Sequence, residues 1–265
     1  MKPVHINSFI SKRLKAGWKP RTVNLDVISL RCALKHARKD GWIQRLPTDG
    51  LDPLQTTTPK RSLFTTADLD KLCAAAFEKR EDGSPVTKNA QQFTDYIRLM
   101  AYCGARRSEA LALRWDAVDF DNDHLTIGAD GNTKNSEHRS VDFNPKLKAH
   151  LKDMQKRKAP DSEFLFPSPQ RGDKDASTKT FKESLGLVRT RAKMPKFNFH
   201  DCRHHFISMC VMAGIDFMTI ASWVGHKDGG VLIGKVYGHL ANEHKKAMAA
   251  KLNFGPVVLE KTGTN

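Results

Sequence analysis

The chain has 265 residues, of which 39% are hydrophobic and 28% charged, and its 44 Lys and Arg against 29 Asp and Glu give a formal net charge of +15. This length predicts one or two domains with a core large enough to fold without disulfide or metal crosslinks, and the composition excludes a disordered tail and a membrane protein. So large a positive charge indicates a polyanionic partner, with nucleic acid the first candidate and an anionic membrane surface the second.

No segment predicts export or membrane insertion. Residues 1–15 lack the apolar stretch of about 7–15 residues that marks a secretory signal. The most apolar stretch, residues 206–225, is interrupted by Gly214 and Asp216, so it predicts a pair of buried helices. We therefore expect a cytoplasmic protein without a membrane partner.

The cysteines predict no disulfide framework and no structural zinc ribbon, because they are odd in number and form no CxxC pair. All lie in segments of helical pattern, where a free cysteine usually acts as a small buried apolar group. We expect this role for Cys32, Cys73, Cys103, Cys202 and Cys210.

The first 61 residues form a basic region, with 13 Lys and Arg against four Asp and Glu. Apolar residues recur at helical spacing over residues 6–17 and 21–43, and Gly41 marks the end of the second helix. The basic residues are interleaved with apolar ones, so they belong to a folded face rather than to a disordered tail. Residues 47–59, rich in proline and threonine, read as a linker.

The second region is mainly helical. Thr65 is a candidate N-cap followed by an acid in the first turn, and the helix that it starts continues toward residue 80. Short alternating runs on both sides of a turn-rich centre predict a hairpin or small sheet over residues 124–143. Gly214 and Gly225 are placed as the residues that end two helices. Further helices are expected over residues 90–103, closed by Gly104, and over 108–115, 144–157, 178–193, 199–213, 217–224 and 241–252.

The candidate catalytic residues are cations at the ends of these elements. The sequence offers no close pair of carboxylates and no glycine-rich phosphate loop. Each cation alone has an ordinary structural explanation, but together they suit a phosphodiester, because arginines bind the non-bridging oxygens and lysine or histidine can move protons. The set comprises Arg106, Arg107, Lys134, His200, Arg203 and His226.

A nucleophile has to come from a small set of tyrosines. Tyr96 and Tyr102 fall in the apolar pattern before Gly104 and are expected in the core. Tyr237 follows the turn at His226 in a glycine-interrupted stretch. Elimination therefore indicates Tyr237.

Four segments, in order along residues 101–240, give the chain a resemblance to the tyrosine recombinases, or phage-type integrases. The family's first-arginine box resembles AYCGARRSEALALRWDAVDF (101–120), and its hairpin lysine motif resembles TKNSEHRSV (133–141). Its HxLRH box is similar to HDCRHHF (200–206), and its nucleophile box to WVGHKDGGVLIGKVYGHL (223–240). The resemblance assigns the family's catalytic positions to Arg106, Lys134, His200, Arg203, His226 and the nucleophile Tyr237.

The resemblance implies a mainly α fold with a small antiparallel β-sheet (α+β), in the two-domain architecture of these enzymes. Residues 1–58 would be part of the helical core-binding domain with its linker, and residues 59–265 the catalytic domain. The resemblance implies a first domain that would be shorter than the family's by one or two helices. The spacing of eleven residues between His226 and Tyr237 is a little longer than is common, and Cys202 stands in place of the usual leucine.

The reaction implied is metal- and ATP-independent strand transfer on double-stranded DNA, without a cofactor. Tyr237 would attack the scissile phosphate, form a 3′-phosphotyrosyl bond and release a 5′-hydroxyl, and the 5′-hydroxyl of a second DNA would then attack that bond. Arg106 and Arg203 would stabilise the charge on the non-bridging oxygens, with a further hydrogen bond from His226.

Proton transfer is assigned by the same resemblance. Lys134 would be the general acid for the leaving 5′-oxygen, and His200 would assist proton transfer with the tyrosine. Glu109, one helical turn after Arg106, is expected to orient that arginine or to form an ordinary helix ion pair.

The basic region would supply affinity for DNA through phosphate contacts, which position a protein without specifying a sequence. Arg107 replaces an aliphatic residue of the family pattern and is a candidate contact to DNA or to another subunit. The expected contacts in the first domain are Lys19, Arg21, Arg31, Lys35, Arg38 and Lys39.

The expected function is therefore site-specific recombination that integrates or excises a phage or mobile element. The expected assembly is a homo-tetramer on paired DNA sites in the nucleoid of a bacterial host, with accessory DNA-bending proteins as possible partners.

Three alternatives are open. A metalloenzyme would use His200 and His204, which lie four residues apart, with a third ligand such as His226 or His239. A non-cutting DNA-binding protein of the same fold would bind DNA without an adduct. A type IB topoisomerase would act as a monomer rather than on paired sites.

Overall fold

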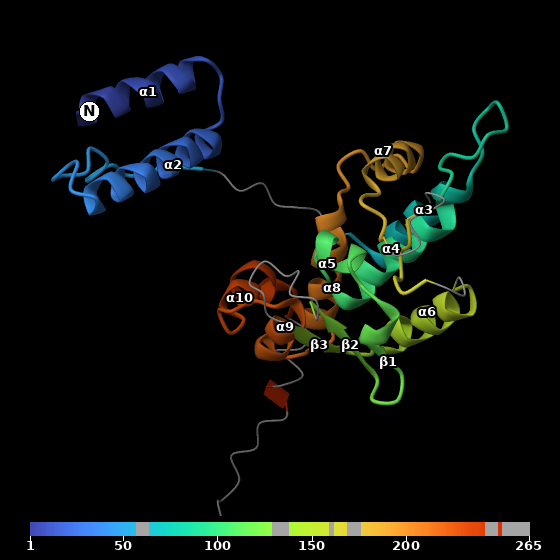
Figure 1. The fold of residues 1–265 in the computed structure, drawn as a ribbon. Helices are drawn as coiled ribbons and strands as arrows, with labels where there is room; N and C mark the ends of the chain where they lie inside the picture. Colours follow the sequence, from blue (N-terminus) through green and yellow to red (C-terminus); the bar gives the residue numbers. More distant parts are fainter. Residues whose placement is uncertain (57–63, 129–137, 159–161, 169–175, 242–248, 251–265) are drawn as a thin grey trace, which may run out of the picture. The chain divides into compact units, whose positions relative to one another are not determined.

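A computed structural model describes residues 1–56, 64–128, 138–158, 162–168, 176–241 and 249–250. The chain divides into two compact units, unit 1 (Met1–Ser62) and unit 2 (Leu63–Asn265) (Figure 1). This division lies four residues beyond the boundary expected at residue 58. The assignment of unit 1 as a partial core-binding domain stays a prediction.

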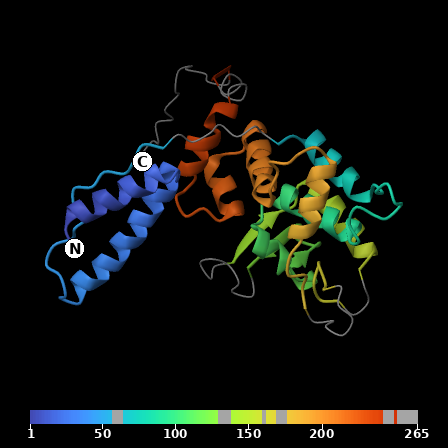
Figure 2. The same ribbon diagram turned by 90° about the horizontal axis from the view of Figure 1, so that it is seen from above.

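Unit 1 is built on two helices that pack side by side, α1 (Pro3–Lys15) and α2 (Pro20–Lys39) (Figure 2). Each begins with proline in its first turn, where the missing N–H costs no helical hydrogen bond. A salt bridge of 2.7 Å between Arg13 and Asp26 joins them, and the small core includes Ile6 and Val23. The second helix ends at Lys39, just before Gly41, whose φ is +80°, as the sequence predicts.

The expectation for one cysteine was wrong. Cys32 is exposed on α2, whereas Cys73, Cys103, Cys202 and Cys210 are buried as expected. A two-helix unit has a narrow buried stripe, so a helical position with apolar neighbours in sequence can still face solvent.

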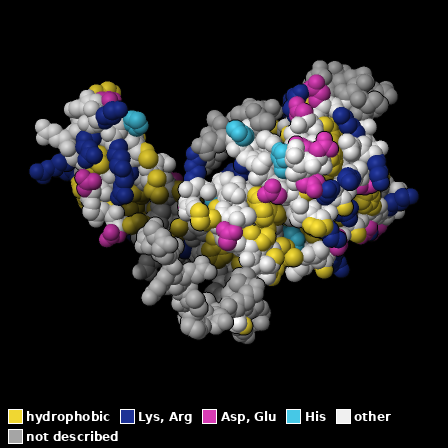
Figure 3. Space-filling model, turned by 90° about the horizontal axis from the view of Figure 1, so that it is seen from below, with side chains coloured by type: hydrophobic (Ala, Val, Ile, Leu, Met, Phe, Trp, Pro, Cys, Tyr) yellow, Lys and Arg dark blue, Asp and Glu magenta, His cyan; other side chains and the backbone are white. Residues whose placement is uncertain are grey.

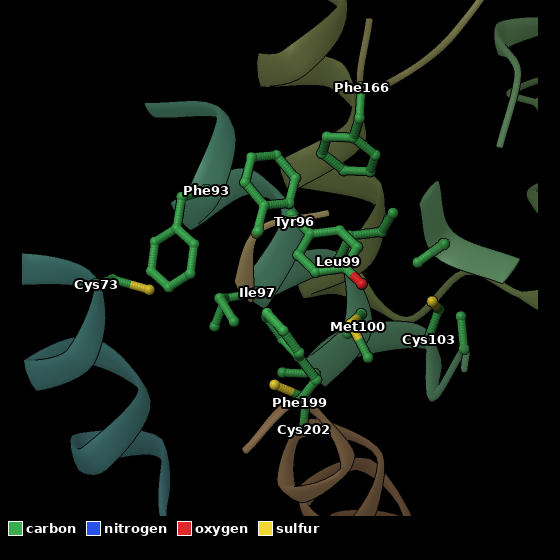
Figure 4. Close-up of a cluster of buried hydrophobic side chains, with 14 of the residues drawn as sticks. Cys73, Phe93, Tyr96, Ile97, Leu99, Met100, Cys103, Phe166, Phe199 and Cys202 are labelled. Atoms are coloured by element: carbon green, nitrogen blue, oxygen red, sulfur yellow. The ribbon is translucent and has the colours of Figure 1, made fainter. Parts of the chain in front are cut away.

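Unit 2 has α4 (Ala90–Cys103) at its centre, packed against α3 (Thr66–Phe77), α6 (Pro145–Lys156) and α8 (Phe199–Met212). Helix α3 starts at the predicted cap, because Thr65 Oγ1 accepts the N–H of Asp68 at 3.1 Å and the Asp68 carboxylate accepts the N–H of Thr65 at 3.0 Å. The core of unit 2 contains the aromatic rings of Phe93, Tyr96, Phe166 and Phe199, with the thiol of Cys202 beside them (Figure 4).

The predicted small sheet is present and has one strand more than the hairpin. Strands β1 (Val118–Asp119), β2 (His124–Ile127) and β3 (Arg139–Asp142) are antiparallel in the order β1-β2-β3. Leu125 pairs with Val141, and both are buried. The turn between β2 and β3, residues 129–137, lies outside the described residues.

In unit 2, two predicted helices have different bounds and one helix was not predicted. Helix α5 (Arg107–Leu111) is shorter than predicted, because the chain after it pairs with residues 163–165: the Trp115 N–H donates to the Glu163 carbonyl at 2.8 Å. Helix α7 (Lys182–Arg191) starts four residues late. Helix α10 (Val231–Tyr237) was not predicted, because Gly229, Gly230 and Gly234 obscure its pattern.

Helix α9 (Phe217–Val224) has the predicted bounds, and α8 and α10 pack beside it at one end of unit 2 (Figure 1). The apolar stretch 206–225 is thus the second half of α8 followed by α9. Among the described residues, no helix is both long and apolar enough to cross a membrane. Short 3-10 turns at Trp115–Ala117 and Gly238–Ala241 complete the described elements, and most of the helix expected over 241–252 lies outside them.

Candidate active site

The candidate site begins at the turn that ends α4. Gly104 has a φ of +68°, and a Cβ at this position would lie 2.5 Å from Cδ1 of Phe206 on α8. Glycine therefore allows both the left-handed turn and the close approach of α8. Two residues later, Arg106 forms the N-cap of α5.

Arg106 is held from two directions. Its Nη1 donates to Glu109 Oε1 at 2.7 Å and its backbone N–H to Glu109 Oε2 at 2.8 Å, while its Nη2 donates to the Gly225 carbonyl at 3.2 Å. The side chain is still 31% exposed. It is fixed in place and open to a ligand on its exposed side.

Arg203 lies beneath it and is only 2% exposed. Its Nη1 donates to the Gly104 carbonyl at 2.7 Å and its Nη2 to the Val224 carbonyl at 2.5 Å. Burial and the nearby charges of Arg106 and Arg139 lower the pKa of Arg203 to about 9. An anion bound beside Arg203 would stabilise its charged form and raise this pKa.

A third arginine of the site, Arg139, was missed by the sequence predictions. Its Nε donates to the Trp223 carbonyl at 2.7 Å, and its two Nη atoms donate to the Glu109 carboxylate at 2.6 and 3.2 Å. The period of two in β3 was the available signal, because Arg139 shares a sheet face with the buried Val141.

The three guanidinium groups all donate hydrogen bonds to the carboxyl end of α9. Three consecutive carbonyls, those of Trp223, Val224 and Gly225, accept hydrogen bonds from Arg139, Arg203 and Arg106 respectively. The negative end of the helix dipole therefore faces these cations. Helix α9 packs on β3, which brings Arg139 to this end.

Glu109 is the carboxylate that balances part of this charge, and it is 3% exposed. Burial on its own raises the pKa of Glu109, but the hydrogen bonds from Arg139 and Arg106 outweigh it and lower the pKa to about 2. Glu109 is thus ionised at neutral pH. It joins Arg106 to Arg139, a wider role than orienting Arg106 alone.

His226 follows directly after the three carbonyls. Burial, and then the charge of Arg203, lower its pKa below the ordinary 6.5. Its Nδ1 is buried and has no hydrogen-bond partner among the described residues. The neutral imidazole is therefore placed beside the arginines with one ring nitrogen unused.

Tyr237 lies at the end of α10 and is 6% exposed, between α8 and α9. Its hydroxyl contacts Nδ1 of His204, a residue that the sequence predictions considered only as a metal ligand. His200 lies one turn earlier on α8, exposed, with its ring 4.5 Å from that of His204. His204, rather than His200, thus contacts the tyrosine.

A surface pocket of about 430 Å³ adjoins Arg106. Arg106, Arg107 and His200 line it, together with the amino end of α8 at Asn198. Arg107 is exposed, and its backbone carbonyl accepts the hydroxyl of Tyr96 at 2.9 Å. A ligand in this pocket would lie beside Arg106.

The remaining predicted residues lie elsewhere. Lys134 is outside the described residues, and the predicted DNA contacts of the first region all belong to unit 1. Figure 3 shows Lys and Arg side chains at the surface of unit 1. Arg31 differs from the others, because its Nη2 donates to the carbonyls of Thr48 and Leu51 at 2.9 and 3.1 Å. The exposed members of the set are Lys19, Arg21, Lys35, Arg38 and Lys39.

No group of three or more His, Cys, Asp or Glu side chains in the described part of the chain is arranged to hold a metal ion. The two histidines of the metalloenzyme alternative instead sit edge to face, at an interplanar angle of 82°.

Comparison with known proteins gives concordant matches. The phage integrase family model matches residues 64–244. Tyrosine recombinase XerA of Pyrococcus furiosus is 24% identical over 247 residues, covering 93% of this chain and 79% of XerA. The ICEBs1 integrase of Bacillus subtilis is 24% identical over 270 residues, covering 94% of this chain and 69% of the relative. The Tn1549 transposon integrase, solved in complex with circular intermediate DNA, has the same fold with a TM-score of 0.70 at 18% identity, covering 94% of this chain and 85% of that one.

Proposed function

Because this chain belongs to the phage integrase family, we propose that it is a site-specific recombinase that cleaves and rejoins duplex DNA through a 3′-phosphotyrosyl intermediate. Family membership makes it a DNA-cleaving and rejoining enzyme of the tyrosine recombinase type. The observation that carries the proposal is the convergence of Arg106, Arg139 and Arg203 on the carboxyl end of α9, within one unit that also holds Tyr237.

The arginines supply the charge that the reaction needs. A phosphodiester gains negative charge on its non-bridging oxygens as a nucleophile attacks, and guanidinium groups fixed beforehand stabilise it without reorganising. Arg106 offers its exposed side to these oxygens, and Arg203 supports the site from below. In the described residues, both hydrogen bonds of the Arg203 guanidinium go to neutral carbonyls, so its charge is available to the substrate.

The other groups complete the reaction. Tyr237 forms the O–P bond, with His200 assisting the transfer of its proton, while the bond to the 5′-oxygen breaks and Lys134 protonates that oxygen. His226 donates a further hydrogen bond to the phosphate. In the second step a 5′-hydroxyl of the partner DNA attacks the phosphotyrosine and releases Tyr237, so phosphodiester energy is conserved without ATP or a metal ion.

Unit 1 provides non-specific affinity through Lys19, Arg21, Lys35, Arg38 and Lys39, with Arg107 contacting DNA or a neighbouring subunit from unit 2. The active assembly is a homo-tetramer on two paired sites, with accessory DNA-bending proteins where the sites require them. The enzyme acts on DNA in the bacterial nucleoid, and its reaction integrates or excises a mobile element.

The test uses labelled duplexes with a nick near the scissile position, tiled across the DNA that flanks the native gene. A nick lets the short product diffuse away, so cleavage traps a covalent adduct that survives SDS. We expect an adduct in the presence of EDTA with wild type and none with Tyr237→Phe, which should bind the same duplex with unchanged affinity.

Tyr102→Phe is the matched control, since Tyr102 is a half-buried tyrosine of α4 whose ring packs against His150. It should keep the adduct. Adduct formation by Tyr237→Phe would contradict the nucleophile assignment. Binding without any adduct in wild type would favour a non-cutting protein, and relaxation of a plasmid by monomers without paired sites would favour a topoisomerase.

A further inference from the structure

Among the described residues, the side chain of His204 contacts the Tyr237 hydroxyl. Its Nδ1 meets the Tyr237 hydroxyl, with the ring centroids 5.7 Å apart. His204 lies one residue after Arg203 and one turn after His200 on α8. Helix α8 therefore carries a phosphate-binding arginine and the partner of the tyrosine side by side.

This contact is supported by the packing of α10. The Asp228 carboxylate accepts the backbone N–H groups of Gly230 and Leu232 at 3.1 and 2.9 Å, which fixes the start of the helix. A Cβ at Gly230 would lie 2.5 Å from the Phe217 carbonyl oxygen, so α10 starts directly against α9. The Tyr237 ring at the other end packs among apolar side chains of α8 and α9.

A tyrosine nucleophile has to lose its proton as the O–P bond forms, and a phenol ordinarily has a pKa of about 10. Because the ring is buried, a partner in direct contact is the natural acceptor for that proton. An imidazole nitrogen serves as such an acceptor near neutral pH. In the described structure this partner is His204 Nδ1.

We propose that His204 is a catalytic residue, the general base that takes the Tyr237 proton, and that His200 passes this proton between His204 and solvent. The inference rests on the proposed recombinase function and replaces His200 as the residue next to the tyrosine. The exposure of His200 and its ring contact with His204 suit the outer position of such a relay.

The step balances as follows. In cleavage the Tyr237 O–H proton moves to His204 Nδ1, the tyrosine oxygen bonds to phosphorus, and the 5′-oxygen leaves with a proton from the leaving-group acid. In rejoining, the incoming 5′-hydroxyl bonds to phosphorus and gives its proton to the leaving-group acid, which cleavage left deprotonated. The departing Tyr237 oxygen then recovers a proton from His204.

The experiment measures single-turnover adduct formation with two nicked substrates that differ in the bridging atom. One carries the natural 5′-oxygen and the other a 5′-bridging sulfur, which leaves as a thiolate and needs no acid. Wild type is measured first, because its failure to form an adduct would contradict the proposed function itself, whatever His204 does.

For His204→Gln we expect a loss of about 10²–10⁴-fold in cleavage rate, the range of general acid–base catalysis. The loss should be equally large with the sulfur substrate, since the nucleophile still has to be deprotonated. Lys134→Ala, which removes the proposed leaving-group acid, should be slow only with the oxygen substrate. Added imidazole should restore part of the rate to His204→Ala, which a packing defect would not permit.

His205→Gln is the matched control for the loss of a histidine from α8. His205 is buried, and its Nδ1 bonds to the Phe64 carbonyl at 2.7 Å. This variant should reveal any loss of stability caused by removing a histidine from α8, while His204 stays in contact with Tyr237. His200→Gln should be impaired less than His204→Gln, because water can replace an outer relay group.

Two results would overturn the proposal. One is a His204→Gln variant that cleaves at the wild-type rate. The other is a larger loss in His200→Gln than in His204→Gln, combined with failure of imidazole to rescue His204→Ala, which would return the role of base to His200.

Discussion

Arg139 and Glu109 form a bidentate salt bridge. Arg139 Nη2 donates to Glu109 Oε2 at 2.6 Å, and Arg139 Nη1 donates to Glu109 Oε1 at 3.2 Å. Glu109 also accepts from Arg106, and Arg139 also donates to α9. The pair therefore links the start of α5, the sheet and the end of α9. Through it, the position of Arg106 depends on a strand residue about thirty places further along the chain.

The first prediction concerns the pH dependence of stability. Glu109 has a folded-state pKa of about 2 against an ordinary 4.5, so the unfolded chain binds its proton first as the pH falls. The stabilisation, about 3 kcal/mol by proton linkage, is complete above about pH 4.5 and lost as the pH falls toward 2. The free energy of unfolding, measured with urea, should rise with pH across this range in wild type, and Glu109→Gln should lose this rise. An unchanged pH dependence in the variant would contradict the assignment.

The second prediction concerns Arg139 as a positioning residue. Arg139→Lys keeps the charge but not the paired hydrogen bonds, so we expect slower adduct formation with unchanged DNA binding. A double-mutant cycle with Glu109→Gln should give a coupling of about 0.5–3 kcal/mol in the cleavage barrier. Additive effects of the two substitutions would show that Arg139 does not act through Glu109.

The third prediction concerns the turn at Gly104. Both Gly104→Ala and Gly83→Ala bear the cost of a left-handed conformation, about 1–2 kcal/mol, because their φ values are +68° and +77°. Only at Gly104 would the new Cβ meet Phe206, which adds about 1–3 kcal/mol of overpacking. Equal losses of stability in denaturant unfolding would contradict the close packing of α8 on this turn.

The fourth prediction concerns His226. Since burial and Arg203 lower its pKa, it should be neutral at pH 7 in the enzyme without DNA. An oxyanion at the arginines adds negative charge and should raise the pKa. Histidine NMR titrations with and without vanadate, using His226→Asn to assign the signal, measure the shift; a signal that vanadate leaves unchanged would place His226 away from the phosphate.

The fifth prediction separates the basic residues of unit 1. Lys35→Ala and Lys39→Ala should each weaken binding on any sequence and reduce the slope of log K against log salt by about 1. Arg31→Ala should instead lower the unfolding temperature, because its guanidinium holds the carbonyls of Thr48 and Leu51. A full reduction in salt slope for Arg31→Ala would restore it as a phosphate contact.

The sequence by itself determined the elements whose signals are local. Helices α4 and α9 have their predicted bounds because an apolar period and a terminal glycine lie within a few residues of each other. The four motif segments likewise led to the family, and elimination among three tyrosines left Tyr237. Each helix end and each motif was recognised from residues within one short segment.

Only the tertiary structure decided which side chains meet. Arg106 and Gly225 are 119 residues apart, and Arg139 and Trp223 are 84 apart, so their contacts depend on how α9 packs on the sheet. The packing of α10 on α8 places His204, and not His200, on the Tyr237 hydroxyl. No periodicity encodes these distances, because a contact between distant segments is fixed by the path of the chain and the filling of the core rather than by local propensity.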